Sequence, residues 1–305
     1  MIMKILIAGA TGLIGTKLTQ HLLDKGHEVN YLTTSKTKVK NDGKLSGFFW
    51  DPYNKEIDNE AFDGVDIIIN LAGKSINSSW NKEGRKDIFR SRMKPSDALY
   101  NYLKDNPHQV KQIISASAIA IYRSNKNRYY KEDTQILSNS FLGRVCTTWE
   151  LYNNQFESIG IPTTVLRLGL VCNKGQGVLK PFVTMCKYFF AGSLGSGSQW
   201  YSWIHIDDVV RMIDFCIENS LTGTYNAVAP TPIKQRQFIR KIAKKLKRPI
   251  TRPPIPSFLL ILAMGGKYKL ITDSQKVCAD KIISKGFEFK YPDFDSAIND
   301  LYGKK

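Results

Sequence analysis

The chain has 305 residues, enough for one large α/β domain and a smaller second region, because a single α/β domain can reach about 250 residues. With 42% hydrophobic and 23% charged residues it can bury a sizeable core, which excludes a disordered, collagen-like or low-complexity chain. The longest strongly apolar stretch, residues 258–264, is far shorter than the roughly 18 residues that a membrane-spanning helix needs. The first residues lack the basic region of a signal peptide, so we expect a cytoplasmic location.

The formal net charge is +17, and a field of this size would attract nucleic acid, anionic lipid or phosphate-bearing metabolites. The basic residues are spread along the chain, and only residues 241–252 form a dense cluster. Because no helix-turn-helix, RRM, KH or zinc-finger pattern accompanies them, a solvated basic surface is favoured over a nucleic-acid site. The five cysteines are odd in number and form no CxxC pair, which indicates isolated thiols and no metal site.

Short apolar runs alternate with helical patterns through the first half of the chain. A strand at 4–8, a helix at 12–25 ending at Gly26, and a strand at 28–33 form an opening βαβ unit. Further strands are expected at 65–70, 112–117 and 163–168. This alternation predicts the α/β class, with a doubly wound parallel, Rossmann-like sheet.

The pattern of alternating strands and helices ends after Leu170, where Gly-rich loops and then a helix at about 207–218 follow. We therefore expect a dinucleotide-binding domain at 1–170, with 200–230 as a candidate addition to it. Residues 171–305 are expected to form a smaller α+β substrate region.

A glycine pattern lies at the junction between the first strand and the first helix. Gly9 allows a sharp turn, Gly12 lets backbone N–H groups approach a pyrophosphate, and Gly15 lets the helix lie close to the strand. The spacing is GxxGxxG, and a merely tight turn is the less favoured alternative. We expect the whole loop to bind a dinucleotide, namely Gly9, Thr11, Gly12, Leu13, Ile14 and Gly15.

The second strand ends without the Asp or Glu that would hold a ribose 2′-hydroxyl. Thr33, Thr34, Ser35 and Lys36 stand there instead, and hydroxyls with a lysine suit a 2′-phosphate. NADP is therefore favoured over NAD as the cofactor, with a solvated lysine-rich loop as the alternative.

Several further motifs together resemble the extended short-chain dehydrogenase/reductase superfamily, and within it the atypical branch of nucleoside-diphosphate-sugar epimerase-like proteins with a C-terminal domain of unknown function. The resemblance covers nearly the whole chain. Besides the glycine loop, the motifs that carry it include residues 70–73, 115–119, 149–150, 166–169, 203–208, 226–230 and 286–293.

The resemblance implies that Leu71, Ala72 and Gly73 pass beneath the cofactor, and that Thr33 and Thr34 lie by its adenosine phosphate. It also implies that Asp87, Arg92 and Val171 are cofactor contacts. Relatives often carry Arg at the position of Thr34, and the forked guanidinium grips a phosphate better than the Lys36 ammonium does.

Catalysis in the superfamily uses a Tyr as acid and base, a Lys four residues later, and a Ser that orients the substrate. By this resemblance Phe141 and Val145 occupy the Tyr and Lys positions, and neither can move a proton. Ser117 stands where the superfamily Ser would be, although a small residue packing a strand end explains it equally well. Tyr122 is the second candidate catalytic residue, because a Tyr at this place in relatives lies near the nicotinamide. His205 could titrate near neutral pH, but a structural role beside Asp207 and Asp208 is favoured.

Three hypotheses follow from these observations. The first is an NADP-dependent oxidoreductase or epimerase-like enzyme acting on a nucleotide-sugar or small polar carbonyl. The second is a non-catalytic NADP-binding sensor or docking protein. The third is a basic scaffold for nucleic acid or anionic membranes, which rests only on the charge. We expect a small-molecule substrate, a homodimer as a candidate assembly, and neither a membrane nor a nucleic-acid partner.

Overall fold

The computed structural model describes residues 2–251 and 254–303, so Arg252 and Pro253, at the end of the predicted basic cluster, lie outside it. The chain separates into two compact units. Unit 1 comprises Met1–Ser117, Arg144–Leu166 and Val210–Thr224, and unit 2 comprises Ala118–Gly143, Arg167–Val209 and Tyr225–Lys305. Both units therefore draw on segments from each side of the boundary expected at residue 170.

Unit 1 holds most of a nine-stranded sheet in the order β14, β9, β7, β6, β1, β2, β4, β3, with β5 paired to β4. The pairs of β1 with β2 and β6, of β2 with β4, and of β6 with β7 are parallel. The strands are β1 (Lys4–Ala8), β2 (Glu28–Thr33), β3 (Asn41–Asp42), β4 (Leu45–Asp51), β5 (Glu56–Ile57), β6 (Ile67–Asn70), β7 (Gln112–Ala118), β9 (Thr163–Leu168) and β14 (Gly223–Ala227). The predicted α/β class with a mostly parallel sheet is confirmed.

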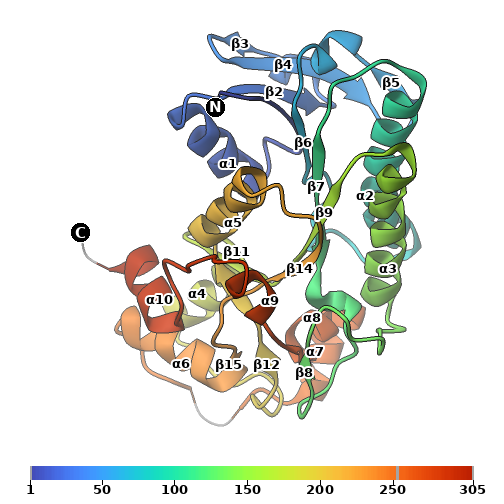
Figure 1. Ribbon diagram of the computed structural model, residues 1–305. Helices are drawn as coiled ribbons and strands as arrows, with labels where there is room; N and C mark the ends of the chain where they lie inside the picture. Colours follow the sequence, from blue (N-terminus) through green and yellow to red (C-terminus); the bar gives the residue numbers. More distant parts are fainter. Residues whose placement is uncertain (1, 252–253, 304–305) are drawn as a thin grey trace. The chain divides into compact units, whose positions relative to one another are not determined.

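Helices lie on both faces of this sheet: α2 and α3 are on one side, and α1 and α5 are on the other (Figure 1). The helices are α1 (Leu13–Asp24), α2 (Lys82–Asp105), α3 (Phe141–Asn154) and α5 (Ile206–Glu218), with short 3₁₀ turns η1 (Lys36–Lys38), η2 (Asn59–Phe62) and η4 (Gln155–Ile159). The central strands are buried, as Ile67–Asn70 shows by being buried at every position. Such strands need cover on both faces, and the helices provide it.

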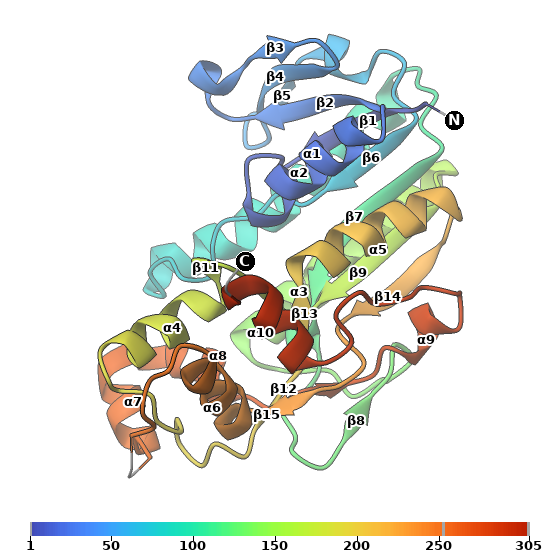
Figure 2. The same cartoon turned by 90° about the vertical axis from the view of Figure 1, so that its left-hand side faces the viewer.

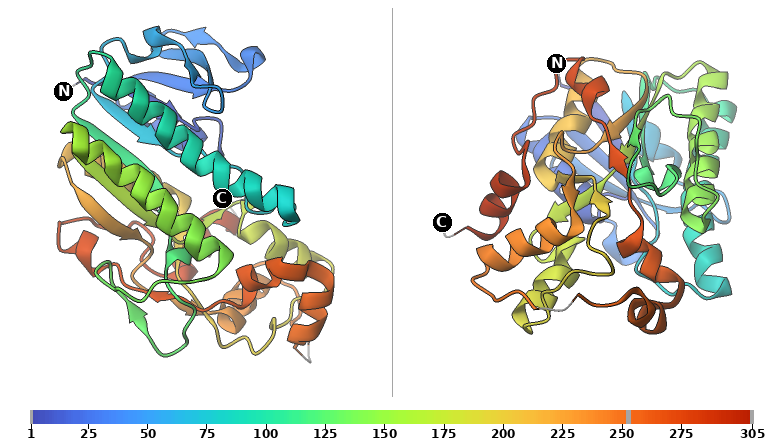
Figure 3. Two further views of the ribbon diagram at one scale, coloured as in Figure 1. Left: turned by 90° about the vertical axis from the view of Figure 1, so that its right-hand side faces the viewer. Right: turned by 90° about the horizontal axis from the view of Figure 1, so that it is seen from below.

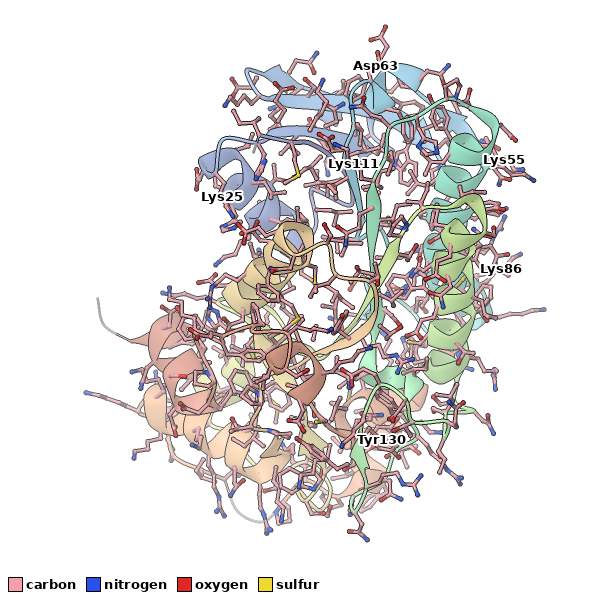
Figure 4. All side chains as sticks on the ribbon, in the orientation of Figure 1. Lys25, Lys55, Asp63, Lys86, Lys111 and Tyr130 are labelled. Carbon is pink, nitrogen blue, oxygen red and sulfur yellow. The ribbon has the colours of Figure 1, made fainter. Side chains whose placement is uncertain are left out.

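Lys25 follows the last residue of α1 and ties that helix to α5. Its ammonium donates to Asp214 at 2.8 Å and to Glu218 at 2.6 Å, and Asp214 also contacts His21 at 2.8 Å. Lys25 is labelled at this end of α1 in Figure 4. Two helices that follow strands far apart in the sequence are thus pinned to each other on one face of the sheet.

Unit 2 has its own core, in which aromatic side chains such as Phe182, Tyr201, Phe238 and Phe294 pack edge to face or stacked. Its strands are β8 (Tyr129–Tyr130), β10 (Leu170–Asn173), β11 (Gln176–Gly177), β12 (Trp200–Tyr201), β13 (Trp203–His205), β15 (Ile233–Lys234) and β16 (Lys276–Val277). Its helices are α4 (Leu179–Lys187), α6 (Gln235–Lys245), α7 (Ser257–Met264), α8 (Lys269–Thr272), α9 (Asp280–Ile283) and α10 (Phe294–Tyr302), with 3₁₀ turns η3 (Ile119–Ile121) and η5 (Gly265–Tyr268). Figure 2 and Figure 3 show α4, α6 and α7 gathered in this unit.

All five cysteines lie in described segments, where each is buried and none forms a disulfide. Among the described helices, none combines the length and apolarity that crossing a bilayer would require.

Candidate functional site

The loop after β1 can be built only with glycine at two positions. Gly9 has φ +91°, and a Cβ there would lie 2.8 Å from the carbonyl carbon of Leu71. A Cβ at Gly15 would lie 2.2 Å from the carbonyl oxygen of Gly9. The first strand, the loop and the helix are therefore packed as closely as backbone allows, as the sequence predicts for this motif.

Gly12 begins α1 in extended backbone and has no side chain with which to cap the helix. Thr11 is exposed beside it, whereas Leu13 and Ile14 are half-buried. The first N–H groups of a helix lack partners within the helix and favour an anion. The loop thus fits the pyrophosphate of a dinucleotide, because both the open helix end and the missing Cβ of Gly12 leave room for it.

Leu71, Ala72 and Gly73 follow β6 and lie against this loop, since Leu71 N–H donates to the carbonyl of Ala8 at 2.8 Å. Asn70, which is fully buried, accepts from the backbone N–H of Ala72 at 3.2 Å and so fixes the course of this segment.

Asn70 is itself held by a chain of buried polar groups that sequence reasoning missed. Its amide donates to Ser96 at 3.0 Å, and Ser96 donates to Asn153 at 2.8 Å. Asn153 donates in turn to the carbonyl of Ala116 at 3.1 Å. The network links α2, α3 and β7 to the segment after β6, and no local pattern in the sequence indicates it.

The residues after β2 offer hydroxyls and an ammonium to solvent. Thr33 is buried, and its hydroxyl oxygen accepts from the N–H of Ser35 at 3.2 Å. Thr34 and Lys36 are exposed, and the Lys36 ammonium lies 4.9 Å from the centre of the Phe49 ring. The groups available to a ligand are therefore those of Thr34, Ser35 and Lys36, while Thr33 shapes the turn.

Asp87 and Arg92 lie on the same helix, α2, with different surroundings. The Lys74 ammonium donates to Asp87 at 2.7 Å, and this hydrogen bond holds the pKa of the exposed carboxyl below its usual value. Arg92 donates to the carbonyl of Ile88 at 2.9 Å and lies 5.2 Å from the Trp149 ring, and burial lowers its pKa. Arg92 also lies by Gly73, where a Cβ would come 3.4 Å from its Cγ.

Ser117 is buried at the end of the unit 1 part of β7, and its hydroxyl donates to the carboxylate of Glu150 at 2.6 Å. Glu150 belongs to the motif at residues 149–150, and the sequence alone indicates no partner for it. The Ser117 hydroxyl proton is therefore already donated to a carboxylate on α3.

Tyr122 belongs to unit 2, where it is fully buried and stacks on Tyr130 with ring centres 5.0 Å apart. Tyr130 is labelled in Figure 4. The Tyr122 hydroxyl donates to Asn226 at 2.7 Å and accepts from Arg167 at 2.8 Å. Burial raises the pKa of Tyr122 to about 12, so the hydroxyl keeps its proton at neutral pH.

The residues predicted at the catalytic Tyr and Lys positions both lie on α3. Phe141 is the first residue of α3 and Val145 is a buried residue of that helix. Neither side chain has a proton to transfer. Val171, a predicted cofactor contact, lies in unit 2 on β10 and pairs with Ile204 of β13.

Unit 2 also contains a polar pocket of about 390 Å³ that sequence reasoning did not anticipate. Arg123 and Lys269 bring positive charge to it, and Asp273 brings a carboxyl whose pKa is raised by burial. Hydroxyls and an amide complete its lining, from Ser124, Ser138, Asn139 and Ser140. Arg123 and Ser124 also line a second hollow of about 370 Å³, which includes Arg128 and Tyr130.

Comparison with known proteins identifies the family to which this architecture belongs. The model of the NAD dependent epimerase/dehydratase family matches residues 5–227, which is most of the chain. The chain belongs to this family. A second family model, the domain of unknown function DUF1731, matches residues 255–301 of this chain. Together the two matches confirm the predicted family resemblance.

Relatives of the NAD dependent epimerase/dehydratase family match along nearly the whole chain. An epimerase family protein of Staphylococcus saprophyticus is 35% identical over 97% of this chain and 98% of its own length. The human epimerase family protein SDR39U1, solved with NADPH, is 25% identical with a TM-score of 0.85, covering 98% of this chain and 99% of that one. A nucleoside-diphosphate sugar epimerase of Corynebacterium glutamicum is 26% identical with a TM-score of 0.80, and this chain spans 59% of its length.

His205 of this family member is buried in unit 2, and its Nδ1 accepts from the N–H of Asp207 at 3.1 Å. Its Nε2 lies 3.4 Å from Asp300. These three side chains are close enough to hold a metal ion, with donor atoms within 4.8 Å of one another. Because Nδ1 accepts this N–H, Nε2 carries the proton in the neutral ring and offers no lone pair to a metal ion.

Proposed function

We propose that this protein binds NADPH at the loop Gly9–Gly15 of unit 1. The single observation that carries this proposal is the close-packed glycine loop, which leads from β1 into an uncapped helix end. Nothing larger than a hydrogen fits at Gly9 and Gly15, while the N-terminus of α1 favours a pyrophosphate. The NADPH of the human relative SDR39U1 supports the choice of cofactor.

The residues after β2 support the phosphorylated form of the cofactor. Thr34, Ser35 and Lys36 would hold a 2′-phosphate through hydroxyls and a point charge, and residues 34–40 include no carboxylate that would repel it. A lysine gives a weaker grip than a bidentate arginine would. We therefore expect NADPH to bind more tightly than NADH, by a modest factor.

We further propose an oxidoreductase or epimerase-like reaction on a nucleotide-sugar or small polar carbonyl compound. The bound cofactor would supply or accept a hydride. The chain itself would bind and orient the reactants, because Ser117 is bonded to Glu150 and Tyr122 keeps its proton. Protons would then come from water or from the substrate.

The unit 2 pocket supports an anionic substrate. Arg123 and Lys269 bring a guanidinium and an ammonium, and the serine hydroxyls around them are ordinary partners for phosphate oxygens. A phosphate-bearing metabolite fits this lining better than a neutral carbonyl compound does.

A second candidate function is a non-catalytic NADPH sensor or docking protein. The feature that favours it is the apolar pair Phe141 and Val145 on α3, where the family resemblance predicts the Tyr and Lys of active relatives. On this proposal NADPH binding changes protease sensitivity or affinity for a partner, and no substrate is turned over.

Calorimetric titration with NADPH and NADH tests the cofactor proposal. We expect tighter binding of NADPH, a loss of that preference in Lys36→Ala, and wild-type behaviour in Lys40→Ala, which removes the same charge four residues later. Equal affinity of the wild-type protein for both cofactors would overturn the 2′-phosphate assignment, and no binding of either would overturn the site.

Turnover separates the two candidate functions. NADPH oxidation is followed with a panel of phosphorylated carbonyl compounds, using wild type and Arg123→Ala. Because an epimerase returns the hydride to its substrate and consumes no net cofactor, conversion of nucleotide-sugars between epimers is followed separately by NMR in the presence of oxidised NADP. Turnover that Arg123→Ala weakens supports the enzyme. Saturable NADPH binding without turnover, together with a changed proteolysis pattern, supports the sensor.

A further inference from the structure

Unit 2 exposes a group of large apolar side chains that no part of the proposed function uses. Three of them, Tyr188, Phe189 and Phe190, follow α4 directly and are 69%, 55% and 65% exposed. Four more, Phe258, Leu259, Ile261 and Leu262, lie on α7, where Leu262 is 83% exposed. We name these seven side chains the apolar patch. Scattered exposed apolar residues are ordinary, but a contiguous group marks an interaction site.

The aromatic part of the patch is held outward by its backbone. Phe189 has φ +64°, a conformation that costs a bulky residue energy and that survives only where neighbours fix it. The Phe190 N–H donates to Met185 at 2.9 Å, and the Thr251 hydroxyl donates to the carbonyl of Phe189 at 2.6 Å. The three rings are therefore presented to solvent by a defined turn.

Hydrogen bonds join the residues that follow this turn to the segment that precedes α7. Thr251 N–H donates to Ala191 at 2.9 Å, and Ile255 N–H donates to Ser193 at 2.8 Å. In both side views, Figure 2 and the left panel of Figure 3, α7 and the end of α4 lie together at one side of the unit. The two parts of the patch are thus neighbours on one side of unit 2.

The helix α7 carries more apolar side chains than it buries. Only Leu260 is buried among its eight residues, in the core that also holds Phe182 and Phe238. A surface helix of a water-exposed protein carries polar residues on its outer face. The outer face of α7 carries Phe258 and Leu262 instead.

The surroundings of the patch are strongly basic. Residues 158–206 and 219–272 contain no Asp or Glu, although they include α4, α6 and α7. The Arg248 guanidinium lies 5.2 Å from the centre of the Phe189 ring, and Lys187 and Lys247 are exposed. Residues 219–272 hold eleven basic residues in the sequence, of which Lys241 is paired with Asp295 of α10. The positive charge beside the patch is therefore taken from Arg248, Lys187 and Lys247.

We propose that the apolar patch docks unit 2 onto the surface of an anionic phospholipid bilayer. The aromatic rings and the outer face of α7 would enter the boundary between headgroups and acyl chains, where aromatic and leucine side chains are favoured. Arg248, Lys187 and Lys247 would attract the anionic headgroups. This inference goes beyond the proposed function, does not rest on it, and departs from the sequence-based expectation that the protein has no membrane partner.

Charge complementarity favours a bilayer over the other occupants of such a patch. A symmetric contact between two copies brings each patch against itself, which would set the basic residues of both copies against one another. Nucleic acid would satisfy the lysines and arginines but would leave Leu262 and Ile261 in water. An anionic bilayer satisfies both the charge and the apolar area.

Flotation with vesicles tests the proposal on the full chain. We expect binding to equimolar phosphatidylcholine and phosphatidylglycerol vesicles, little binding to pure phosphatidylcholine, and partial weakening by salt. Phe190→Ser and Leu262→Ser should each reduce the partition coefficient by about ten-fold. Leu151→Ser is the matched control, because Leu151 is 67% exposed on α3 in unit 1, and it should bind like wild type.

NADPH titration and thermal unfolding of the variants check that the fold is intact, since both serine substitutions change exposed side chains. No vesicle binding by the wild-type protein at low salt would overturn the proposal. A dimer that Leu262→Ser converts to a monomer, without vesicle binding, would assign the patch to a contact between copies. RNA binding without vesicle binding would assign the charge to nucleic acid, and either result overturns the membrane assignment.

Discussion

The hydroxyl of Ser117 donates to the carboxylate of Glu150 across 2.6 Å, in a part of unit 1 where both side chains are buried. The serine at the end of β7 is therefore coupled to α3 through a charge-assisted hydrogen bond, which is among the stronger kinds in proteins. Any role of Ser117 toward a substrate has to compete with this bond.

Replacing Ser117 by Ala should lower the free energy of unfolding by about 1 to 3 kcal/mol, because the Glu150 carboxylate loses a donor in a buried place. Ser115→Ala is the control on the same strand, since the buried Ser115 hydroxyl has no hydrogen-bond partner among the described residues, and its loss should cost little. Urea unfolding measures both. Equal effects of the two substitutions would contradict a stabilising bond between Ser117 and Glu150.

Tyr122→Phe should also destabilise the protein by about 1 to 3 kcal/mol, because Arg167 and Asn226 each lose a buried partner. NADPH affinity should be unchanged, since the loop that we propose for the cofactor belongs to unit 1. Tyr188→Phe removes an exposed hydroxyl and serves as the control in thermal unfolding. If Tyr122→Phe abolished turnover while leaving stability intact, Tyr122 would be a catalytic residue.

Two glycines of the loop should respond differently to alanine. At Gly12 a Cβ meets only the Gly9 carbonyl oxygen at 3.2 Å, so Gly12→Ala should fold and should lose about ten-fold or more in NADPH affinity. At Gly15 the Cβ would overlap the Gly9 carbonyl, so Gly15→Ala should lower stability by at least about 1 to 3 kcal/mol. Circular dichroism melts and calorimetric titration separate the effects. Unchanged NADPH binding by a folded Gly12→Ala protein would count against the proposed site.

The contribution of Asp214 to the stability of unit 1 should be lost as the pH falls into the acid range. Burial alone would raise the pKa of this carboxyl, but hydrogen bonds from His21 and Lys25 outweigh it and hold the pKa below its usual value. A lowered pKa contributes stability above the unfolded-state pKa of about 3.9, and that contribution is lost as the pH falls through the folded-state value.

Asp214→Asn should therefore be less stable than wild type by about 1 to 3 kcal/mol at neutral pH, with the gap closing below about pH 4. Urea unfolding at several pH values measures the gap. Asp24→Asn, which removes an exposed carboxyl bonded only to the neutral amide of Gln20 among its described contacts, should show little change at any pH. A gap that stayed constant down to acid pH would show that the charge of Asp214 is not its source.

Sequence patterns predicted the regular part of the fold well, because buried parallel strands and a glycine loop leave local signals. The strands Lys4–Ala8, Glu28–Thr33 and Thr163–Leu168 have the predicted bounds. The strand Leu45–Asp51 was missed, since a glycine interrupts its apolar residues. That glycine is needed because the Tyr31 ring of the neighbouring strand covers it, where a Cβ would lie 2.4 Å away.

In the candidate site, too, only the features with a local sequence pattern could be predicted. The glycine loop that we propose for the cofactor is contiguous, so residue types and spacing predicted its close-packed geometry. The partners of Ser117 and Tyr122 come from segments 33 and 104 residues away, and only folding brings them together. The pocket around Arg123 and Lys269 likewise joins distant loops and leaves no pattern in the chain.

The five buried cysteines can report local unfolding, because each becomes reactive only when its surroundings open. Burial raises the pKa of Cys216 to about 12 and that of Cys186 to about 11, so thiolates are scarce in the closed state and alkylating reagents react slowly. Cys146 and Cys216 lie in unit 1, and Cys172, Cys186 and Cys278 lie in unit 2. Mass spectrometry of timed alkylation would therefore read the opening rate of each unit separately, without any label having been introduced.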